Sequence, residues 1–261
     1  MVKFGMPTLI ERPDPAESAA LCQELGLSFV ELNMNLPQYQ IAPMDQAGLD
    51  RIARDYGISY TIHLDDNLNV GDFNPAVAAA YEQTVLDAVG LARRLEIPLL
   101  NMHLHKGAVF TLPERKVYVF EAFRDDYLRR MTEFRNRCQA VIGDSGVRIC
   151  IENIGGYAPW QIETLDVLLE SDAFGLTLDV GHNYCSGGRD EPVILERDSR
   201  LRHIHLHDAK LPKQDHLALG NGELDIGRYL KLAQEHQCSV VLETKTIAGL
   251  RASVDWLEKH R

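Results

Sequence analysis

The sequence predicts a single (β/α)8 TIM barrel, an α/β fold in which eight parallel strands close on themselves inside a ring of helices. Short β-rich apolar runs alternate with longer amphipathic segments from one end of the chain to the other. The chain has 261 residues, which is close to the usual length of such a barrel. No linker or low-complexity stretch divides it, so we expect one domain over residues 1–261.

Each of the eight expected strands ends in polar residues. The strands are Lys3–Leu9, Phe29–Asn35, Ser59–Leu64, Pro98–Leu104, Val147–Asn153, Gly175–Asp179, Leu201–Asp208 and Ser239–Lys245. The expected helices are Pro15–Leu25, Met44–Tyr56, Pro75–Leu95, Val117–Ile142, Trp160–Glu170, Val193–Ser199, Ile226–His236 and Ala248–Lys259. A longer loop, Gly107–Arg115, follows the fourth strand, and we expect its Phe110 and Pro113 to form part of a lid.

Charge and composition favour an enzyme that acts on small molecules. The 38 acidic and 27 basic residues give a net charge of −11, which works against binding to nucleic acid or to an anionic membrane. No apolar stretch approaches the ~20 residues of a membrane span, and the amino terminus has no signal-peptide pattern, so we expect a cytoplasmic protein. The five cysteines are scattered, which argues against both a disulfide framework and a thiolate zinc site.

Histidine, aspartate and glutamate recur at the carboxyl ends of six expected strands, where a barrel of this kind carries its active site. The residues concerned are His63, His103, His105, Glu152, Asp179, His182, His205, His207 and Glu243. Because they come from separate strands that converge on one face, we expect them to form a common site.

Four of these residues predict a divalent-metal site. Glu152 and Glu243 follow aliphatic strand residues, and a carboxylate there is costly to bury unless it is paired, protonated or bound to a metal. Together with Asp179 and His205 they would make a mixed oxygen and nitrogen ligand set. Manganese or zinc is the favoured ion, with cobalt and magnesium as alternatives.

Other interpretations apply to single residues. His203 is expected to be a hydrogen-bonded core residue. Either glutamate alone could form a core ion pair with a neighbour such as Lys245. Three lysines close to strand ends could bind a substrate phosphate or carboxylate, or could balance the acidic site: Lys106, Lys210 and Lys245.

The order of the motifs resembles the xylose-isomerase-like barrel family over essentially the whole chain. This family includes sugar and sugar-phosphate isomerases, ketose epimerases and metal-dependent abasic-site endonucleases. The motifs are Phe29-Val30-Glu31-Leu32, Ile62-His63, Asn101-Met102-His103, Ile151-Glu152-Asn153, Leu178-Asp179-Val180-Gly181-His182, His205-Leu206-His207-Asp208-Ala209-Lys210, Asp215-His216-Leu217-Ala218-Leu219-Gly220-Asn221-Gly222-Glu223 and Leu242-Glu243-Thr244-Lys245.

The resemblance implies that Glu152, Asp179, His205 and Glu243 bind the metal. In the endonuclease branch, further metals would be held at the positions of four other histidines, with Glu152 bridging. These positions are His63, His103, His182 and His216. That branch has an aspartate two residues before His216, whereas this chain has Gln214 there and Asp215 out of register, which leaves a third metal site incomplete. His207, Glu31 and Lys210 are further candidates for metal or substrate binding.

The activity implied by the resemblance is isomerisation or epimerisation of a sugar, sugar phosphate or sugar acid. The metal would acidify a C–H next to a carbonyl, and Glu152 and Glu243 would take and return the proton through an enediolate at the metal. His182 would contact the substrate oxygen and Glu31 would orient it. Self-association of the barrel into homo-oligomers stays open.

Three alternatives stay open beside this one. The first is cleavage of abasic DNA, which the extra histidines favour and which the net charge and the poor phosphate-binding loops around Arg12 and Tyr39 disfavour. The second is dehydration of a 3-dehydro cyclic acid by the same proton abstraction. The third is a barrel that binds metal and ligand without turnover, although such a protein would gain little from burying two glutamates.

Overall fold

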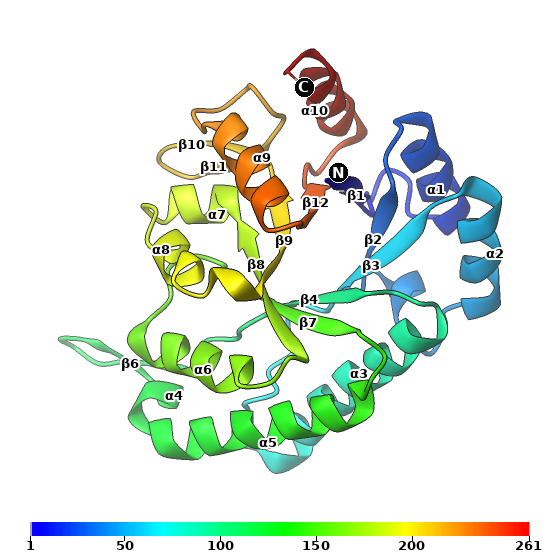
Figure 1. Ribbon diagram of the computed structural model, residues 1–261. Coiled ribbons are helices and arrows are strands. Elements are labelled where there is room, and N and C mark those ends of the chain that lie inside the picture. The colour runs from blue at the N-terminus through cyan, green and yellow to red at the C-terminus, as the bar shows by residue number, and fades with distance from the viewer. Residues whose placement is uncertain (1, 261) are drawn as a thin grey trace.

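The computed structural model describes residues 2–260 and confirms a closed barrel of eight parallel strands surrounded by helices (Figure 1). The strands follow one another around the barrel in chain order, and the last pairs with the first. They are β1 (Lys3–Pro7), β2 (Phe29–Asn33), β3 (Ser59–His63), β4 (Leu99–His103), β7 (Arg148–Glu152), β8 (Phe174–Asp179), β9 (Leu201–Leu206) and β12 (Ser239–Leu242). All eight expected strands are present.

Seven main helices cover the outside of the barrel (Figure 1). They are α1 (Pro15–Glu24), α2 (Gln46–Tyr56), α3 (Pro75–Arg94), α5 (Arg124–Ile142), α6 (Pro159–Leu169), α9 (Ile226–Glu235) and α10 (Ile247–His260). Local side chains begin several of them: Asp14 accepts hydrogen bonds from the amides of Ala16 and Glu17 at 2.9 and 3.1 Å, ahead of a first-turn proline. Among the helices in residues 2–260, none combines the length and the apolar character that a membrane crossing demands.

Two expected helices differ from the structure. The segment Val117–Ile142 begins as a strand and a short helix, α4 (Val119–Ala122), before α5 starts at Arg124. The expected helix Val193–Ser199 overlaps only the end of α8 (Asp190–Leu195) and the start of the 3₁₀ turn η2 (Asp198–Arg200), and a further short helix, α7 (Val180–Cys185), precedes them. Asp179 accepts a hydrogen bond from the His182 amide at 2.7 Å, so α7 begins directly after β8. These elements are too short to produce a helical repeat in the sequence.

The segment predicted as a loop over Gly107–Arg115 contributes to a hairpin. Strands β5 (Val109–Thr111) and β6 (Lys116–Tyr118) pair in antiparallel fashion and project beside α4 and α6 (Figure 1). Phe110 leaves 62% of its surface exposed, so most of its ring faces solvent.

The core has an apolar layer between strands and helices and a polar column inside the barrel. On β3, the hydroxyl of Tyr60 points outward and donates to the carbonyl of Leu49 in α2, whereas Thr61 points inward and donates to Glu31. Alternation along each strand therefore sends one set of side chains to the helices and the other to the barrel axis. Because the inner set includes charged residues, the barrel interior can carry chemistry.

A second hairpin brings an additional histidine to the mouth of the barrel. It consists of β10 (Asp208–Lys210) and β11 (Gln214–Leu217), which pair only with each other. Asp208 is buried, and its carboxylate accepts hydrogen bonds of 2.8 to 3.1 Å from the amides of Ala209, Gly220, Gly222 and Leu224. One carboxylate thus fixes the segment that directly follows β11, the strand that carries His216.

Replacing Asp208 with Ala should lower the free energy of unfolding by about 3 kcal/mol, because buried amides would lose their acceptor. Asp208→Asn keeps one acceptor oxygen and should lose about half as much. Urea denaturation monitored by circular dichroism measures both values. An unchanged midpoint in Asp208→Ala would show that the clamp contributes nothing to stability.

Candidate metal centre

The carboxyl ends of the barrel strands bring the candidate acids and histidines together in one connected group. At its centre, Nδ1 of His205 lies 3.3 Å from Oε1 of Glu152 and 3.0 Å from Oε2 of Glu243. All three side chains are buried. Within residues 2–260, neither Nδ1 of His205 nor Oε2 of Glu243 has a hydrogen-bond partner, although both atoms are buried. Buried polar atoms without hydrogen-bond partners that converge in this way fit a shared cation.

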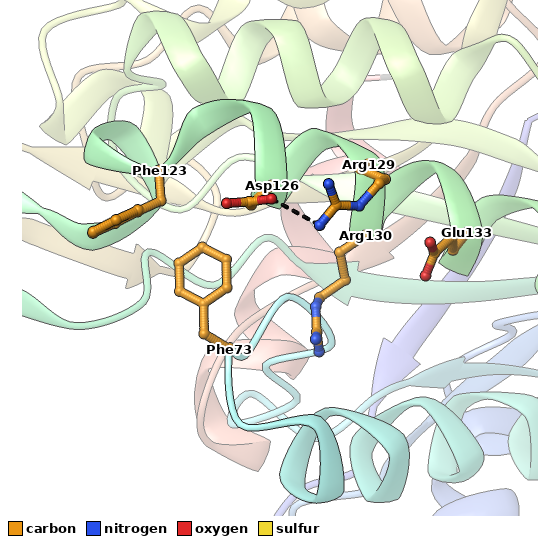
Figure 2. A pocket seen from close by; sticks show the side chains of 6 residues that line it. All are labelled: Phe73, Phe123, Asp126, Arg129, Arg130 and Glu133. Atoms are coloured by element: carbon orange, nitrogen blue, oxygen red, sulfur yellow. Dashed lines mark hydrogen bonds and ion pairs between the residues drawn. The ribbon is translucent and has the colours of Figure 1, made fainter.

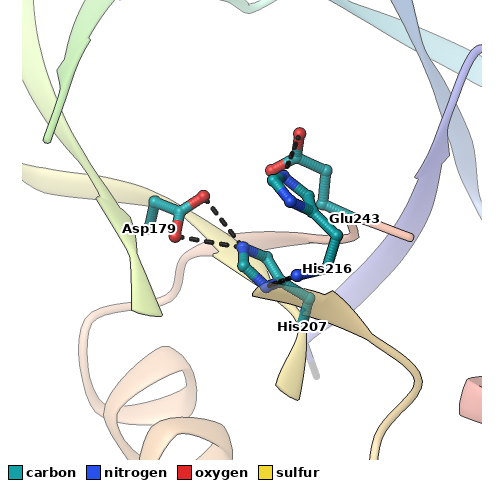
Figure 3. A group of neighbouring side chains, drawn as sticks. All are labelled: Asp179, His207, His216 and Glu243. Carbon is teal, nitrogen blue, oxygen red and sulfur yellow. Dashed lines mark hydrogen bonds and ion pairs between the residues drawn. The ribbon is translucent and has the colours of Figure 1, made fainter. Parts of the chain in front are cut away.

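Asp179, the fourth predicted ligand, lies beside this centre and contacts two other histidines. Both of its carboxylate oxygens are 3.1 Å from Nε2 of His207, and Oδ2 is 3.3 Å from Nδ1 of His182. Figure 3 shows Asp179, His207, His216 and Glu243 facing one another across the mouth. Their ligand atoms all lie within 4.8 Å of one another. Glu243 therefore belongs to both groups and joins the four predicted ligands.

Two flanking groups extend the centre on opposite sides. Nε2 of His103 and of His63 lie 3.1 and 3.5 Å from Oε2 of Glu152, and Asp66 lies 3.3 Å from Nδ1 of His103. On the other side, Asp215 lies 2.9 Å from Nδ1 of His216. A second contact, of 3.9 Å, joins Asp215 to Nε2 of His182. Each flank has two histidines and an aspartate close enough to share an ion.

The three candidate lysines differ in whether they contact the acidic centre. Lys245 Nζ lies 2.7 Å from Oε1 of Glu243, at the edge of the centre. Lys210 is exposed and acts electrostatically on Glu223. Within residues 2–260, Lys106 and Lys210 form no ion pair with an acidic side chain. His105 is also apart from the centre, because its Nδ1 accepts from the amide of Gly107 at 3.0 Å.

Glu31 is buried within the barrel, and both of its carboxylate oxygens contact protein groups. Its Oε1 lies 3.0 Å from Nε2 of His205, and its Oε2 accepts from Thr61 at 3.0 Å and lies 3.2 Å from Nε2 of His203. Nδ1 of His203 in turn lies 2.6 Å from Oγ of Ser239, which agrees with the expected core role of His203. Glu31 therefore contacts the rear nitrogen of His205, an arrangement that orients a metal-binding imidazole.

Charge pairing lowers the pKa values of the buried carboxylates and raises the pKa of the histidine His63. Burial raises the pKa of Glu152, but the imidazoles of His205 and His103 outweigh it and hold that pKa well below its ordinary value. Burial likewise opposes ionisation of Glu243, yet His205 keeps its pKa low. For His63 the burial penalty lowers the pKa, whereas Glu152 raises it, with a net value of about 9. The carboxylates are therefore ionised at neutral pH.

Three residues that contact the candidate ligands were not among the predicted site residues. Asn101 donates a hydrogen bond from Nδ2 to Oε2 of Glu152, and it shares a strand face with His103 because the two are two residues apart on β4. Asp66 lies three residues after the end of β3, so it belongs to the same class of position as the predicted ligands at strand ends. Asp215 joins His182 and His216 although it is one residue out of the expected register. The hairpin, which the sequence did not predict, makes that contact possible.

Open space adjoins the centre on two sides. A cavity of about 190 Å³ is lined by Glu31, His63, Glu243 and Lys245, among others. A second cavity, of about 350 Å³, reaches His182 and Asp215. A larger groove of about 500 Å³ lies on the outside of the barrel between Phe73 and α5, where Arg129 pairs with Asp126 (Figure 2). None of the candidate metal ligands lines that groove, so the volume of a cavity does not identify the functional site.

Replacing Glu31 with Gln should weaken binding of Mn²⁺ or Zn²⁺ about 10- to 100-fold, because His205 would lose the carboxylate behind it. Thr61→Val is the matched control: it removes a hydrogen bond from the same carboxylate without touching His205, and should have a smaller effect. Isothermal titration of the chelator-treated protein gives the metal dissociation constants. Equal affinities in wild type and Glu31→Gln would exclude the positioning role.

Stability of the chelator-treated protein should fall as pH rises from about 6.5 to about 9. The folded pKa of His63 is about 9 against an ordinary value of 6.5, so its contribution is complete below 6.5 and is lost as pH rises through 9. Urea denaturation across this interval measures the loss, and His63→Gln should flatten it. Stability that rises over the same interval would contradict the assignment.

Comparison with known proteins identifies the family. The xylose isomerase-like TIM barrel family matches residues 19–260. An uncharacterised protein of Methanocaldococcus jannaschii is 23% identical over 214 residues, covering 80% of this chain and 80% of that protein.

Two solved structures share the fold. A D-tagatose 3-epimerase-like protein has a TM-score of 0.81 and 20% identity, covering 99% of this chain and 97% of the other. D-allulose 3-epimerase from Methylomonas sp., in complex with D-allulose, has a TM-score of 0.73 and 15% identity, covering 100% and 97%. Since the family match spans nearly the whole chain, the protein belongs to the xylose isomerase-like TIM barrel family.

Proposed function

We propose that this protein is a divalent-metal-dependent isomerase or epimerase of a sugar, sugar phosphate or sugar acid. The observation that carries the proposal is the pair of buried, ionised carboxylates, Glu152 and Glu243, on either side of His205. They come from β7 and from the end of β12, three strands apart around the barrel. Two proton-transfer groups placed this way can act on opposite faces of one substrate carbon.

The proposed ligands of the resident ion are Glu152, Asp179, His205 and Glu243, with Mn²⁺ or Zn²⁺ as the favoured ions. When bound, such an ion would act as a Lewis acid that acidifies the C–H beside a substrate carbonyl. The unsatisfied buried atoms of His205 and Glu243 support this ligand set. The two flanking groups around Asp66 and Asp215 are proposed sites for additional ions.

In the proposed reaction, one glutamate removes the proton and the other returns it. Glu152 is ionised and accepts the proton from carbon, which leaves a cis-enediolate in the substrate. Glu243 takes up a proton from water and delivers it to the opposite face, and Glu152 then releases its proton to water, so that both carboxylates are ionised again. Lys245, whose Nζ lies 2.7 Å from Oε1 of Glu243, orients that carboxylate. Glu31 orients His205 from behind, and His182, which borders the second cavity, contacts a substrate oxygen.

The likeness to the two epimerase structures supports a ketose or a related sugar as the substrate class, and the cavities beside the centre are the proposed place for it. The net charge of −11 disfavours nucleic acid as a partner. We retain the expectation of a cytoplasmic location as part of this proposal.

Solvent-deuterium exchange tests the proposal. The Mn²⁺-loaded protein, incubated in D₂O with ketoses, ketose phosphates and dehydro acids, should incorporate deuterium at the carbon beside a carbonyl. Glu152→Gln and Glu243→Gln should each slow turnover by about 10²- to 10⁴-fold while keeping the fold. Mass spectrometry and proton NMR detect the label, and circular dichroism checks the fold.

Near-normal turnover in both glutamine variants would remove the proposed proton-transfer pair. The products separate the related reactions, because a dehydratase would release water and an epimerase would invert one carbon. Deuterium exchange without a net product would indicate a substrate analogue that binds and ionises but does not complete the reaction.

Cleavage of abasic-site DNA is the second candidate, and the two flanking histidine–aspartate groups favour it. Two or three ions held there would suit phosphodiester hydrolysis. Incubation of the Zn²⁺-loaded protein with an abasic-site oligonucleotide discriminates the two: strand cleavage without deuterium exchange would replace the isomerase proposal.

A further inference from the structure

The amino-terminal end of the barrel contains a cavity of about 410 Å³, on the side opposite the metal centre. Its lining comes from the first residues of five barrel strands and from the segment that precedes β12. The lining residues are Val2, Lys3, Pro98, Leu99, Gly146, Arg148, Arg202, Gln234, Gln237, Cys238 and Ser239. We call this cavity the basal pocket.

The basal pocket is positively charged without local compensation. Lys3, Arg148 and Arg202 line it, and none of its lining residues is acidic. Within residues 2–260 these three side chains form no ion pair with a carboxylate, and the hydrogen bond described for Arg202 goes to the carbonyl of Leu201 at 2.8 Å. In a chain with a net charge of −11, three unpaired cations around one cavity create a local field that attracts an anion.

A strand irregularity directs Arg202 into this pocket. Leu176 on β8 pairs with Leu201 on β9, and the next residue, Thr177, pairs with His203, so Arg202 is an extra residue in β9. An extra residue of this kind re-aims its side chain away from the regular alternation. Without the irregularity, Arg202 would share the outward face of its neighbour Ile204.

Gly175 leaves the space that Arg202 uses. A Cβ atom at position 175 would lie 3.2 Å from Cγ of Arg202 and 3.0 Å from Sγ of Cys150. Any side chain here would therefore crowd the base of the arginine. The bulge and the glycine together hold the half-buried Arg202 at the amino-terminal mouth of the barrel.

We propose that the basal pocket binds the phosphoryl group of a small molecule. Arg148 and Arg202 supply planar guanidinium groups that match phosphate oxygens, and Lys3 adds a point charge. Gln234, Gln237 and Ser239 add neutral polar groups on the same lining. This site is separate from the carboxyl-terminal mouth, and it does not depend on which reaction the metal centre performs.

The position of Ser239 gives a ligand in this pocket a connection to the metal centre. Ser239 lines the pocket, and its hydroxyl lies 2.6 Å from Nδ1 of His203. Nε2 of His203 contacts Glu31, and Glu31 contacts His205. A phosphoryl group that moves Ser239 would therefore move the far end of a continuous chain of buried contacts that reaches a predicted metal ligand.

Titration of the metal-loaded protein with inorganic phosphate tests the proposal. Isothermal calorimetry should reveal a phosphate site that Arg148→Gln and Arg202→Gln each weaken about tenfold or more, because each removes charge-assisted hydrogen bonds. Arg189 lines the cavity beside His182 at the opposite end of the barrel, so the matched change Arg189→Gln should leave the basal pocket unchanged. Metal content and melting temperature confirm that the variants are intact.

A labelling measurement on the unaltered protein keeps the test independent of how the variants fold. Phosphate should protect Arg148 and Arg202 from modification by phenylglyoxal, as mapped by peptide mass spectrometry, and should leave the exposed Arg129 equally reactive. If phosphate protects neither basal arginine, or if only Arg189→Gln weakens phosphate binding, the basal pocket is not a phosphoryl site.

Discussion

The requirement to neutralise buried carboxylates controls the rest of this structure. Glu31, Glu152 and Glu243 all lie within the barrel, where an unpaired negative charge is very costly. His205 lies within 3.3 Å of all three and is their common partner. Five further histidines surround this nucleus, each with a ring nitrogen within 3.5 Å of a carboxylate oxygen: His63, His103, His182, His207 and His216. Removing any single member would leave an uncompensated charge in an enclosed space.

The barrel strands and the candidate ligands could be predicted from the sequence, whereas the contacts among those ligands could not. Strand residues could be predicted because apolar runs ending in a polar residue, such as the one ending at Glu152, repeat eight times. The candidate ligands followed from the same rule, since carboxyl ends of parallel strands converge. Their exact grouping could not follow, because the preference of Asp179 for His207 depends on distances across the barrel rather than on position along a strand.

The elements outside the regular repeat were the ones that the sequence did not predict. The hairpin β10–β11 has only two short strands, and its shape depends on Asp208 bonding to amides up to 16 residues away. No local pattern encodes such a contact. The same is true of the bulge at Arg202, because no residue pattern within β9 marks the point where its pairing with β8 shifts by one residue. Both irregularities place a charged or titratable side chain where a regular strand would not.

The separate pairing of β10–β11 distinguishes the two halves of the candidate metal centre. Glu152 and His205 belong to strands that are hydrogen-bonded on both sides, so they can move only if the barrel opens. His216 belongs to a two-stranded ribbon outside the barrel, whose local opening leaves the eight strands intact. Release of this ribbon would uncover the His216 side of the candidate centre while Glu152 and His205 stay within the barrel wall.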